Sequence, residues 1–233
     1  MKVVILCGGR GTRLVEETRI IPKPLVKIGN KPILLHIINY YKKYGINNFI
    51  IATGYKGYLI KNYFQKKNLD KIKINIVNTG LNTMTGGRLL RLKKYLLNEK
   101  NFMLTYGDGL SNVDIYKSLR FHLRHKKVAT LTAVRPPVRF GELSLKDNKV
   151  IQFREKLQSK SGWINGGYFI FSKKIFSYLK KDSEMLEKEP MSLLVKKKEL
   201  KAYKHNGFWQ CMDTMRDKIY LNDILKKKQA KWI

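Results

Sequence analysis

Short, continuously apolar runs alternate with segments of helical apolar spacing along the first 136 residues. The apolar runs predict strands at residues 3–7, 47–55, 71–79, 101–109 and 128–136. The segments whose apolar residues recur every three or four positions predict helices at residues 32–45, 56–64, 85–97 and 115–127. Strands that alternate with helices form βαβ units, so the pattern predicts a mostly parallel sheet flanked by helices.

Three of the predicted strands lead into a glycine. Gly8, Gly54 and Gly107 stand at the ends of the first, second and fourth strands. The carboxyl ends of parallel strands share one edge of a sheet, and ligands of such sheets bind there. We therefore expect these glycines to mark the edge that holds the functional site.

The pattern changes after Pro136 and Pro137. Residues 139–156 and 162–174 predict an antiparallel layer of short strands, followed by a helix near 176–181 and a closing helix at 220–228. No internal repeat and no long linker divides the chain, so we expect a single domain over residues 1–233. The predicted fold class is α/β, with a Rossmann-like, mostly parallel central sheet and a small antiparallel layer.

The composition is that of a globular protein, since 43% of the 233 residues are hydrophobic and 11% are aromatic. No apolar run approaches the roughly 20 residues of a membrane-spanning helix, and residues 3–7 are too few for a secretory signal. We therefore expect a soluble, cytoplasmic protein without a membrane partner. Cys7 and Cys211 match neither a disulfide framework nor metal-ligand spacing.

The chain is strongly basic: 48 Lys and Arg against 17 Asp and Glu give a formal net charge of +31. Such a field attracts polyanions, which makes nucleic acid one possible partner. The lysines are dispersed along the whole chain, however, and occur among many Ile and Asn residues, a mixture that AT-biased coding also produces. We expect a small anionic substrate and no nucleic-acid partner.

The first strand runs into the sequence GGRGTRL at residues 8–14, and Lys23 follows in PKPLVKIG. This loop lacks the spacing of a P-loop and has Leu14 where a dinucleotide fingerprint has its third glycine. Arg13 offers a charged fork for phosphate oxygens, and Lys23 offers a point charge held between two prolines. Glycine loop, fork and lysine together suit a nucleoside triphosphate that is cleaved with loss of pyrophosphate. A purely structural turn is the alternative for the glycines.

These motifs resemble a known family. GGRGTRL with PKPLVKIGNKPIL is similar to the signature of the sugar-phosphate nucleotidylyltransferases. TGLNTMTGGRL, FMLTYGDG, RFGEL, INGGYFIF and GFWQCMDTMRDK resemble the glucose-1-phosphate cytidylyltransferases, in the same order along nearly the whole chain. The resemblance implies a nucleotidyltransferase (GT-A-like) fold, with a nucleotide-binding part at residues 1–135 and a sugar-phosphate-binding part with the C-terminal helix at 136–233.

The resemblance also implies a metal site. Asp108 in YGDG and Asp213 in QCMDT match the carboxylates that coordinate Mg²⁺ in the family, and Mg²⁺ is the expected cofactor. A turn-forming Asp108 and a helix-capping Asp213 are the alternatives. Arg13, Lys23, Asp108 and Asp213 are the expected catalytic residues.

The remaining site residues are carried over by resemblance alone. The expected nucleotide-binding residues are Leu6, Cys7, Gly8, Gly9, Arg10, Gly11, Thr12, Arg13, Thr83, Arg88 and Gly107. The expected sugar-phosphate-binding residues are Gly141, Glu155, Lys156, Asn165 and Gly166. A helix-surface cation is the alternative for Arg88, and surface ion pairing is the alternative for Glu155.

The activity that the resemblance implies is cytidylyl transfer from CTP to glucose 1-phosphate, which gives CDP-glucose and pyrophosphate. One departure bears on the acceptor: only QKKNLDKIK separates the second helix from the third strand, where the family has a longer insertion used at the rim and in subunit contacts. A homo-oligomer is expected, but its size and the acceptor stay open. The alternatives are UTP or another acceptor phosphate, a non-catalytic sugar-nucleotide sensor, and a nucleic-acid-binding protein.

Overall fold

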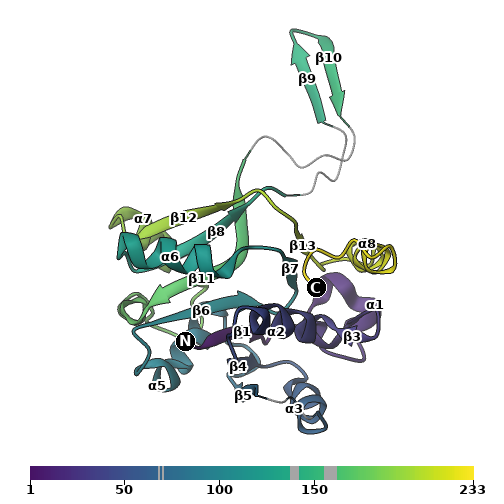
Figure 1. Ribbon diagram of the computed structural model, residues 1–233. Coiled ribbons are helices and arrows are strands. Elements are labelled where there is room, and N and C mark those ends of the chain that lie inside the picture. Colours follow the sequence, from purple (N-terminus) through teal and green to yellow (C-terminus); the bar gives the residue numbers. More distant parts are fainter. Residues whose placement is uncertain (68, 70, 137–141, 155–161) are drawn as a thin grey trace.

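The computed structural model describes residues 1–67, 69, 71–136, 142–154 and 162–233. Within them, a central sheet of seven strands has the order β12-β8-β11-β6-β1-β4-β5 (Figure 1). Its strands are β1 (Val3–Cys7), β4 (Asn48–Thr53), β5 (Lys73–Asn78), β6 (Asn101–Tyr106), β8 (Ala129–Val134), β11 (Ile164–Ser172) and β12 (Leu200–His205). Strand β11 pairs antiparallel with β6 and with β8, and the other pairs are parallel.

Shorter strands and the helices complete the described structure. The short strands are β2 (Lys27–Ile28), β3 (Lys31–Pro32), β7 (Gly109–Ser111), β9 (Glu142–Lys146), β10 (Lys149–Arg154) and β13 (Trp209–Cys211). The α-helices are α1 (Val15–Thr18), α2 (Ile33–Lys43), α3 (Gly57–Gln65), α4 (Thr85–Arg91), α5 (Lys93–Leu96), α6 (Ile115–His125), α7 (Glu189–Lys196) and α8 (Met215–Lys226). The 3₁₀ helices are η1 (Thr12–Leu14), η2 (Lys23–Leu25) and η3 (Lys173–Tyr178).

Two hydrophobic clusters lie on the two faces of the sheet, because alternate residues of a strand point to opposite faces. In β1, Val3 and Ile5 belong to the first cluster, and Val4 and Leu6 belong to the second. Apolar residues of α2, α3, α6 and α8 cover the first face. Residues of α4, η3 and α7 cover the second. Each fully buried Leu or Ile contributes about 1.5–3 kcal/mol to this packing.

The predicted fold class is confirmed, with one difference in the antiparallel part. The separate layer expected from residues 139–174 is reduced to the β9–β10 hairpin, which stands apart from the sheet (Figure 1). Residues 164–172 instead form β11, which is inserted between β6 and β8 of the central sheet. Its burial pattern explains the difference, because the run from Gly166 to Phe171 is buried on both faces.

Helix ends also differ from the prediction. The helix expected at 85–97 is divided into α4 and α5, and the closing helix begins at Met215 rather than at Tyr220. Thr214 caps α8 in a capping box with Asp217, a start signal that lies six residues before the expected helix. Within the described part of the chain, no helix has the length and apolar character that crossing a bilayer requires.

Candidate active site

Three charged side chains from distant parts of the chain converge beyond the carboxyl ends of β1 and β6. The Lys23 ammonium donates to Asp108 Oδ2 at 2.7 Å and to Asp213 Oδ1 at 2.5 Å. Asp213 is 190 residues from Lys23 in sequence. The structure therefore brings together the lysine and the two carboxylates that the sequence predicts to act on one phosphorus atom.

Arg13 completes this group from the solvent side. Its Nη1 donates to Asp213 Oδ2 at 2.6 Å, while its side chain is 72% exposed. The Lys23 side chain is only 11% exposed. Asp213 is thus held between a buried ammonium and an accessible guanidinium, and the free nitrogens of Arg13 can reach a phosphate at the surface.

The electrostatics keep these groups ionised. Burial by itself lowers the pKa of Lys23, but Asp108 and Asp213 outweigh it, so the pKa lies above its usual value. Burial by itself raises the pKa of Asp213, but the hydrogen bond and charge of Lys23, with the charge of Arg13, hold it below its usual value. Both groups therefore carry their charges at neutral pH.

Local structure fixes each of these side chains. Pro22 and Pro24 flank Lys23 at the 3₁₀ turn η2, and the fixed φ of the two prolines restricts the backbone on both sides of Lys23. Asp108 lies between β6 and β7, and β7 pairs with β13 through Gly109 and Cys211. A backbone hydrogen bond from Met212 N–H to Asp108 O, 2.8 Å long, extends that pairing. The short ladder therefore sets the distance between the two carboxylates.

The Asp217 carboxylate holds the chain next to Asp213. Its Oδ2 accepts hydrogen bonds from the N–H groups of Asp213 at 3.0 Å and Thr214 at 2.8 Å. Gln210 Nε2 donates to its other oxygen at 3.0 Å. Thr214 is the N-cap of α8, so the alternative in which Asp213 caps the helix is wrong. Asp213 is free to direct its own carboxylate at Lys23.

The donor set fits a divalent cation. Asp108 and Asp213 direct one oxygen each at the same cationic nitrogen, so two carboxylates already converge on a single positive centre. Carboxylate oxygens are hard ligands, and Mg²⁺ takes one or two of them together with substrate phosphates and water. Among the described residues no group of three or more His, Cys, Asp or Glu side chains could hold a metal ion by itself, so phosphates and water would supply the remaining ligands.

Arg88 explains why the first loop begins with glycine. A Cβ on Gly8 would lie 2.1 Å from the Arg88 guanidinium carbon. Arg88 is 4% exposed and donates to the carbonyl oxygens of Gly8 at 3.0 Å, Thr53 at 3.0 Å and Gly80 at 2.8 Å. It is therefore a buried link between the ends of β1, β4 and β5, and the alternative of a helix-surface cation is wrong.

The other loop glycines divide into packing positions and open ones. Gly11 has φ of 68°, in the left-handed region, and a Cβ there would lie 2.7 Å from Thr18 Cγ2. A Cβ on Gly107 would lie 2.7 Å from the sulfur of buried Cys7. Gly9, in contrast, has no atom within 4 Å of the position of its Cβ. Gly9 is the open position at which a ligand can approach the backbone, beside exposed Arg10 and Thr12.

The remaining predicted nucleotide residues lie close to this loop. Leu6 and Thr83 are buried, with 8% and 7% exposed. A Cβ on Gly80 would meet Thr83 Oγ1 at 2.7 Å, which places Thr83 against the loop that Arg88 holds. Their contacts with a nucleotide stay a prediction.

The predicted acceptor residues are only partly described. Asn165 is exposed at the start of β11 and donates through Nδ2 to the Tyr106 hydroxyl at 3.4 Å. Gly166 is buried and accepts a 2.7 Å hydrogen bond from Trp209 Nε1 at its carbonyl oxygen. Gly141, Glu155 and Lys156 lie outside the described residues. Their assignment stays a prediction.

Sequence reasoning missed one carboxylate in this region. Glu187 accepts hydrogen bonds from the hydroxyl of Tyr106 and from Thr85 Oγ1, the latter at 2.6 Å. Tyr106 ends β6, and Thr85 begins α4, so Glu187 joins the predicted nucleotide side to the side of Asn165. No local pattern around Glu187 pointed to this contact, which joins residues about 80 and 100 positions apart.

Comparison with known proteins identifies the family of this chain. A model of the family described as nucleotidyl transferase matches residues 2–220. The chain belongs to the nucleotidyl transferase family. A divalent metal is typical of its members. The family model covers β1 through the first half of α8, including Arg13, Lys23, Asp108 and Asp213.

Individual relatives define the similarity further. A glucose-1-phosphate cytidylyltransferase of Salmonella typhimurium is 43% identical over 253 aligned positions, which cover 100% of this chain and 98% of that protein. A D-glycero-alpha-D-manno-heptose 1-phosphate guanylyltransferase of Campylobacter jejuni is 38% identical over 180 positions, covering 76% of this chain and 78% of its own. The structure of HddC from Yersinia pseudotuberculosis, complexed with GMP-PN, superposes with a TM-score of 0.76 at 27% identity, covering 96% and 99% of the two chains.

Proposed function

We propose that this protein transfers the cytidylyl group of CTP to a sugar 1-phosphate, with α-D-glucose 1-phosphate as the acceptor and CDP-glucose and pyrophosphate as products. The convergence of Asp108 and Asp213 on Lys23, with Arg13 at the surface, carries the proposal. The full-length similarity to a glucose-1-phosphate cytidylyltransferase supports CTP and glucose 1-phosphate as the substrates. Activity in the cytoplasm as a homo-oligomer remains the prediction from the sequence.

The reaction is an in-line displacement at the α-phosphorus of CTP. An oxygen of the sugar phosphate attacks, the bond to the β-phosphate oxygen breaks, and pyrophosphate leaves with the electron pair. The attacking oxygen is already anionic near neutral pH, so no general base and no covalent nucleophile are needed. Positioning and charge stabilisation supply the rate.

Different residues of the site supply the positioning and the charge stabilisation. Arg13 binds triphosphate oxygens from the accessible side, and Lys23 neutralises charge that develops on the transferred phosphoryl group. The open backbone at Gly9 lets the nucleotide approach, while Arg88 keeps the loop in place from below. Asn165, held next to Tyr106, offers an amide for hydroxyl groups of the acceptor.

Asp108 and Asp213 would hold Mg²⁺. When bound, the ion supplies charge neutralisation to the phosphate oxygens around the reacting phosphorus. Lys23 donates to both carboxylates, so its ammonium keeps the two oxygens close together. Donation to phosphate then replaces donation to the carboxylates.

The first test is release of pyrophosphate from CTP and glucose 1-phosphate by the purified protein. We expect Lys23→Ala and Asp108→Asn to lower kcat by at least about 10³-fold, because each removes charge stabilisation at the reacting phosphate. Lys27→Ala, an exposed lysine four residues after Lys23, is the matched control and should retain activity. Absence of pyrophosphate release with every sugar phosphate and all four nucleoside triphosphates contradicts the proposal.

A second candidate keeps the chemistry and changes the acceptor or the base. The 253 aligned positions exceed the 233 residues of this chain, so the cytidylyltransferase relative has residues that this chain lacks. A relative named for a heptose 1-phosphate is also 38% identical. A panel of CTP, UTP, GTP and ATP against glucose 1-phosphate, and of sugar 1-phosphates against CTP, separates the two candidates by kcat/KM.

A further inference from the structure

An open hollow of about 720 Å³ lies away from the candidate active site. It is lined by residues of α5, η3 and the segments after α6 and α7, which occupy the left of Figure 1, whereas β7 and β13 lie on the right. Lys173 N–H donates to Lys100 O, just before β6 begins, so the hollow borders the amino end of that strand. Strand β6 then runs about 17 Å to the catalytic edge, at a rise of roughly 3.3 Å per residue.

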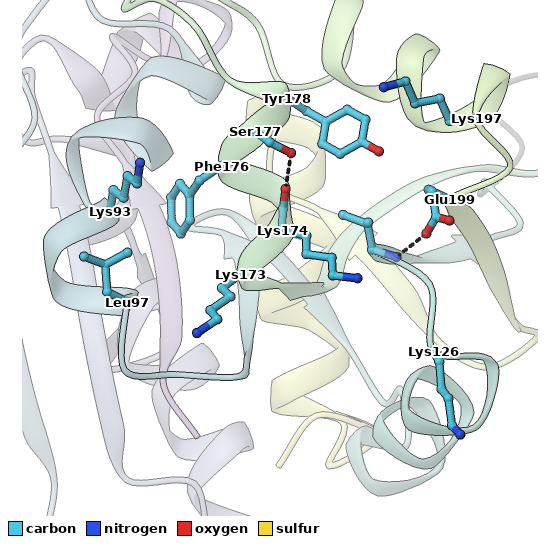
Figure 2. Close-up of a pocket in the computed structure, with 11 residues that line it drawn as sticks. Lys93, Leu97, Lys126, Lys173, Lys174, Phe176, Ser177, Tyr178, Lys197 and Glu199 are labelled. Carbon is cyan, nitrogen blue, oxygen red and sulfur yellow. Dashed lines mark hydrogen bonds between the residues drawn. The ribbon is translucent and has the colours of Figure 1, made fainter.

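Five lysines surround this hollow. They come from four separate segments of the chain: Lys93, Lys126, Lys173, Lys174 and Lys197. All five line the hollow, and Figure 2 shows the ammonium of Lys126 directed away from the other four. All five are exposed, and among the described residues none of them has an ion-pair partner within 4.0 Å.

Only one carboxylate lines the described part of the hollow. Glu199 accepts hydrogen bonds from Val128 N–H at 3.0 Å and from Lys127 Nζ at 3.4 Å, so another lysine already pairs with it. Burial by itself raises the pKa of Glu199, but the hydrogen bonds from Val128 N–H and Lys127, with the charges of Lys127 and Lys174, hold it below its usual value. The five ammonium groups of the lining therefore face a single carboxylate, which already forms an ion pair with Lys127.

Helix stabilisation accounts for only part of this arrangement. Lys126 and Lys197 are the residues at which α6 and α7 end, where a cation interacts favourably with the helix dipole. Lys93 begins α5, and Lys173 and Lys174 begin η3, where a cation opposes the dipole. The helix dipole gives no reason for the second set, which lines the same hollow as the first.

We infer that this hollow, the lysine hollow, binds a ligand with several consecutive phosphate groups. Ammonium groups are strongly hydrated point charges, so they recognise a dense row of negative charge without demanding the fixed geometry of an arginine fork. The hollow presents little for a base to stack on, because Phe176 is 7% exposed and the Lys197 ammonium lies 5.3 Å from the Tyr178 ring centroid. The phosphate chain is thus the recognised part, whether it belongs to inorganic polyphosphate or to a nucleoside triphosphate.

The test uses the full-length protein with inorganic tripolyphosphate and with ATP, without divalent metal and at physiological salt. Acetylation of individual lysines is followed by mass spectrometry. We expect tripolyphosphate to slow the acetylation of Lys93, Lys173 and Lys174 at least threefold. Lys66 and Lys67, exposed at the end of α3, serve as internal controls and should react as before. Equal protection of both sets indicates general counterion binding and overturns the inference.

Matched charge reversals provide the second measurement. Titration calorimetry should detect two tripolyphosphate sites per wild-type chain, one of them at the active site, and one site in K173E/K174E. The control K66E/K67E carries the same change in charge and should retain both sites. All four positions are exposed, so folding is preserved, which circular dichroism verifies. An unchanged stoichiometry in K173E/K174E overturns the inference.

The two ligands distinguish the source of the phosphates. Affinity of the lysine hollow for ATP within about threefold of that for tripolyphosphate shows that the phosphate chain alone is recognised. ATP binding at least tenfold tighter assigns the hollow to nucleotides. Pyrophosphate release from CTP, without tripolyphosphate, should be the same in wild type and K173E/K174E, so failure of the proposed function and failure of this inference give separate results.

Discussion

The two ends of the central sheet differ in the burial and the pairing of their lysines. At the carboxyl end, Lys23 is buried and bonded to Asp108 and Asp213. At the amino end, the lysine hollow leaves exposed lysines around a carboxylate that has its own partner. A buried charge must be paired, and the pairing fixes its position. An exposed charge costs little and stays adaptable, so the first end suits chemistry and the second suits capture of an anion.

The largest effect is expected from replacing Arg88, a buried cation that donates to backbone carbonyl oxygens. We expect Arg88→Met to lower the free energy of unfolding by about 3–5 kcal/mol, because several buried carbonyl oxygens lose their donor at once. Chemical denaturation measures the change. Arg91→Met on the same helix, which removes an exposed ion pair with Asp182, should cost much less. Equal losses in both variants contradict the role of Arg88 as a buried link.

The next effect concerns His122, a buried residue near the amino end of the central sheet. Burial holds the pKa of His122 at about 4, below its usual value of 6.5, and the ring bonds to Thr130 Oγ1 at 2.8 Å. The unfolded chain therefore binds the proton more readily, so stability falls as the pH drops from 6.5 towards 4. We expect His122 to contribute roughly 1–2 kcal/mol of this loss after screening. His122→Gln should lose less stability than wild type over that range, measured by denaturation at pH 7 and pH 4.5.

A smaller effect is expected at Asp217, whose carboxylate holds the backbone of Asp213 in place. Asp217→Asn keeps the size of the side chain but weakens acceptance from Asp213 N–H and Thr214 N–H. We expect a loss of about 1 kcal/mol in stability, and a fall in kcat of roughly tenfold because Asp213 is misplaced. Asp223→Asn, farther along α8, is the matched control. A kcat equal to that of wild type would show that the capping box serves the helix alone.

The smallest effect is expected at the lysine hollow itself. Lys173→Gln with Lys174→Gln removes two exposed charges that have no ion-pair partner in the described structure. We expect the unfolding free energy to stay within about 0.5 kcal/mol of wild type, or to rise slightly as repulsion among lysines is relieved. A large loss of stability would mean that these lysines serve the fold and would weaken the contrast between the two ends.

Much of the catalytic end could be predicted from local sequence. The apolar run at residues 3–7, its glycine exit and the prolines around Lys23 are short-range signals, and a parallel sheet brings such strand ends to one edge. The meeting of Asp213 with Lys23 follows the family motifs. The structure brings them together through the pairing of β7 with β13.

What could not be predicted depends on contacts between distant residues. The sequence predicts that Gly8 belongs to a loop for a nucleoside triphosphate. A Cβ added at Gly8, however, would lie nearest to Arg88, which is 80 residues away in the chain. The apolar sequence of β11 is equally compatible with a strand of a separate layer and with a central strand of the main sheet. Burial on both faces depends on the segments that pack around the strand, which its own sequence does not specify. The lysine hollow joins four segments, and no one of them stands out among the 48 basic residues.

Strand β11 is the one strand of the described central sheet that is antiparallel to its neighbours, and this affects how the choice of acceptor can change among related enzymes. Its beginning, with Asn165, lies beside Tyr106 at the end of β6, so two chain segments of opposite direction meet at the edge that holds the candidate active site. If Asn165 binds the acceptor as proposed, changes at the start of β11 would alter the choice of sugar while Lys23, Asp108 and Asp213 stay unchanged. A family built on such a reversal can replace its acceptor without rebuilding its chemistry.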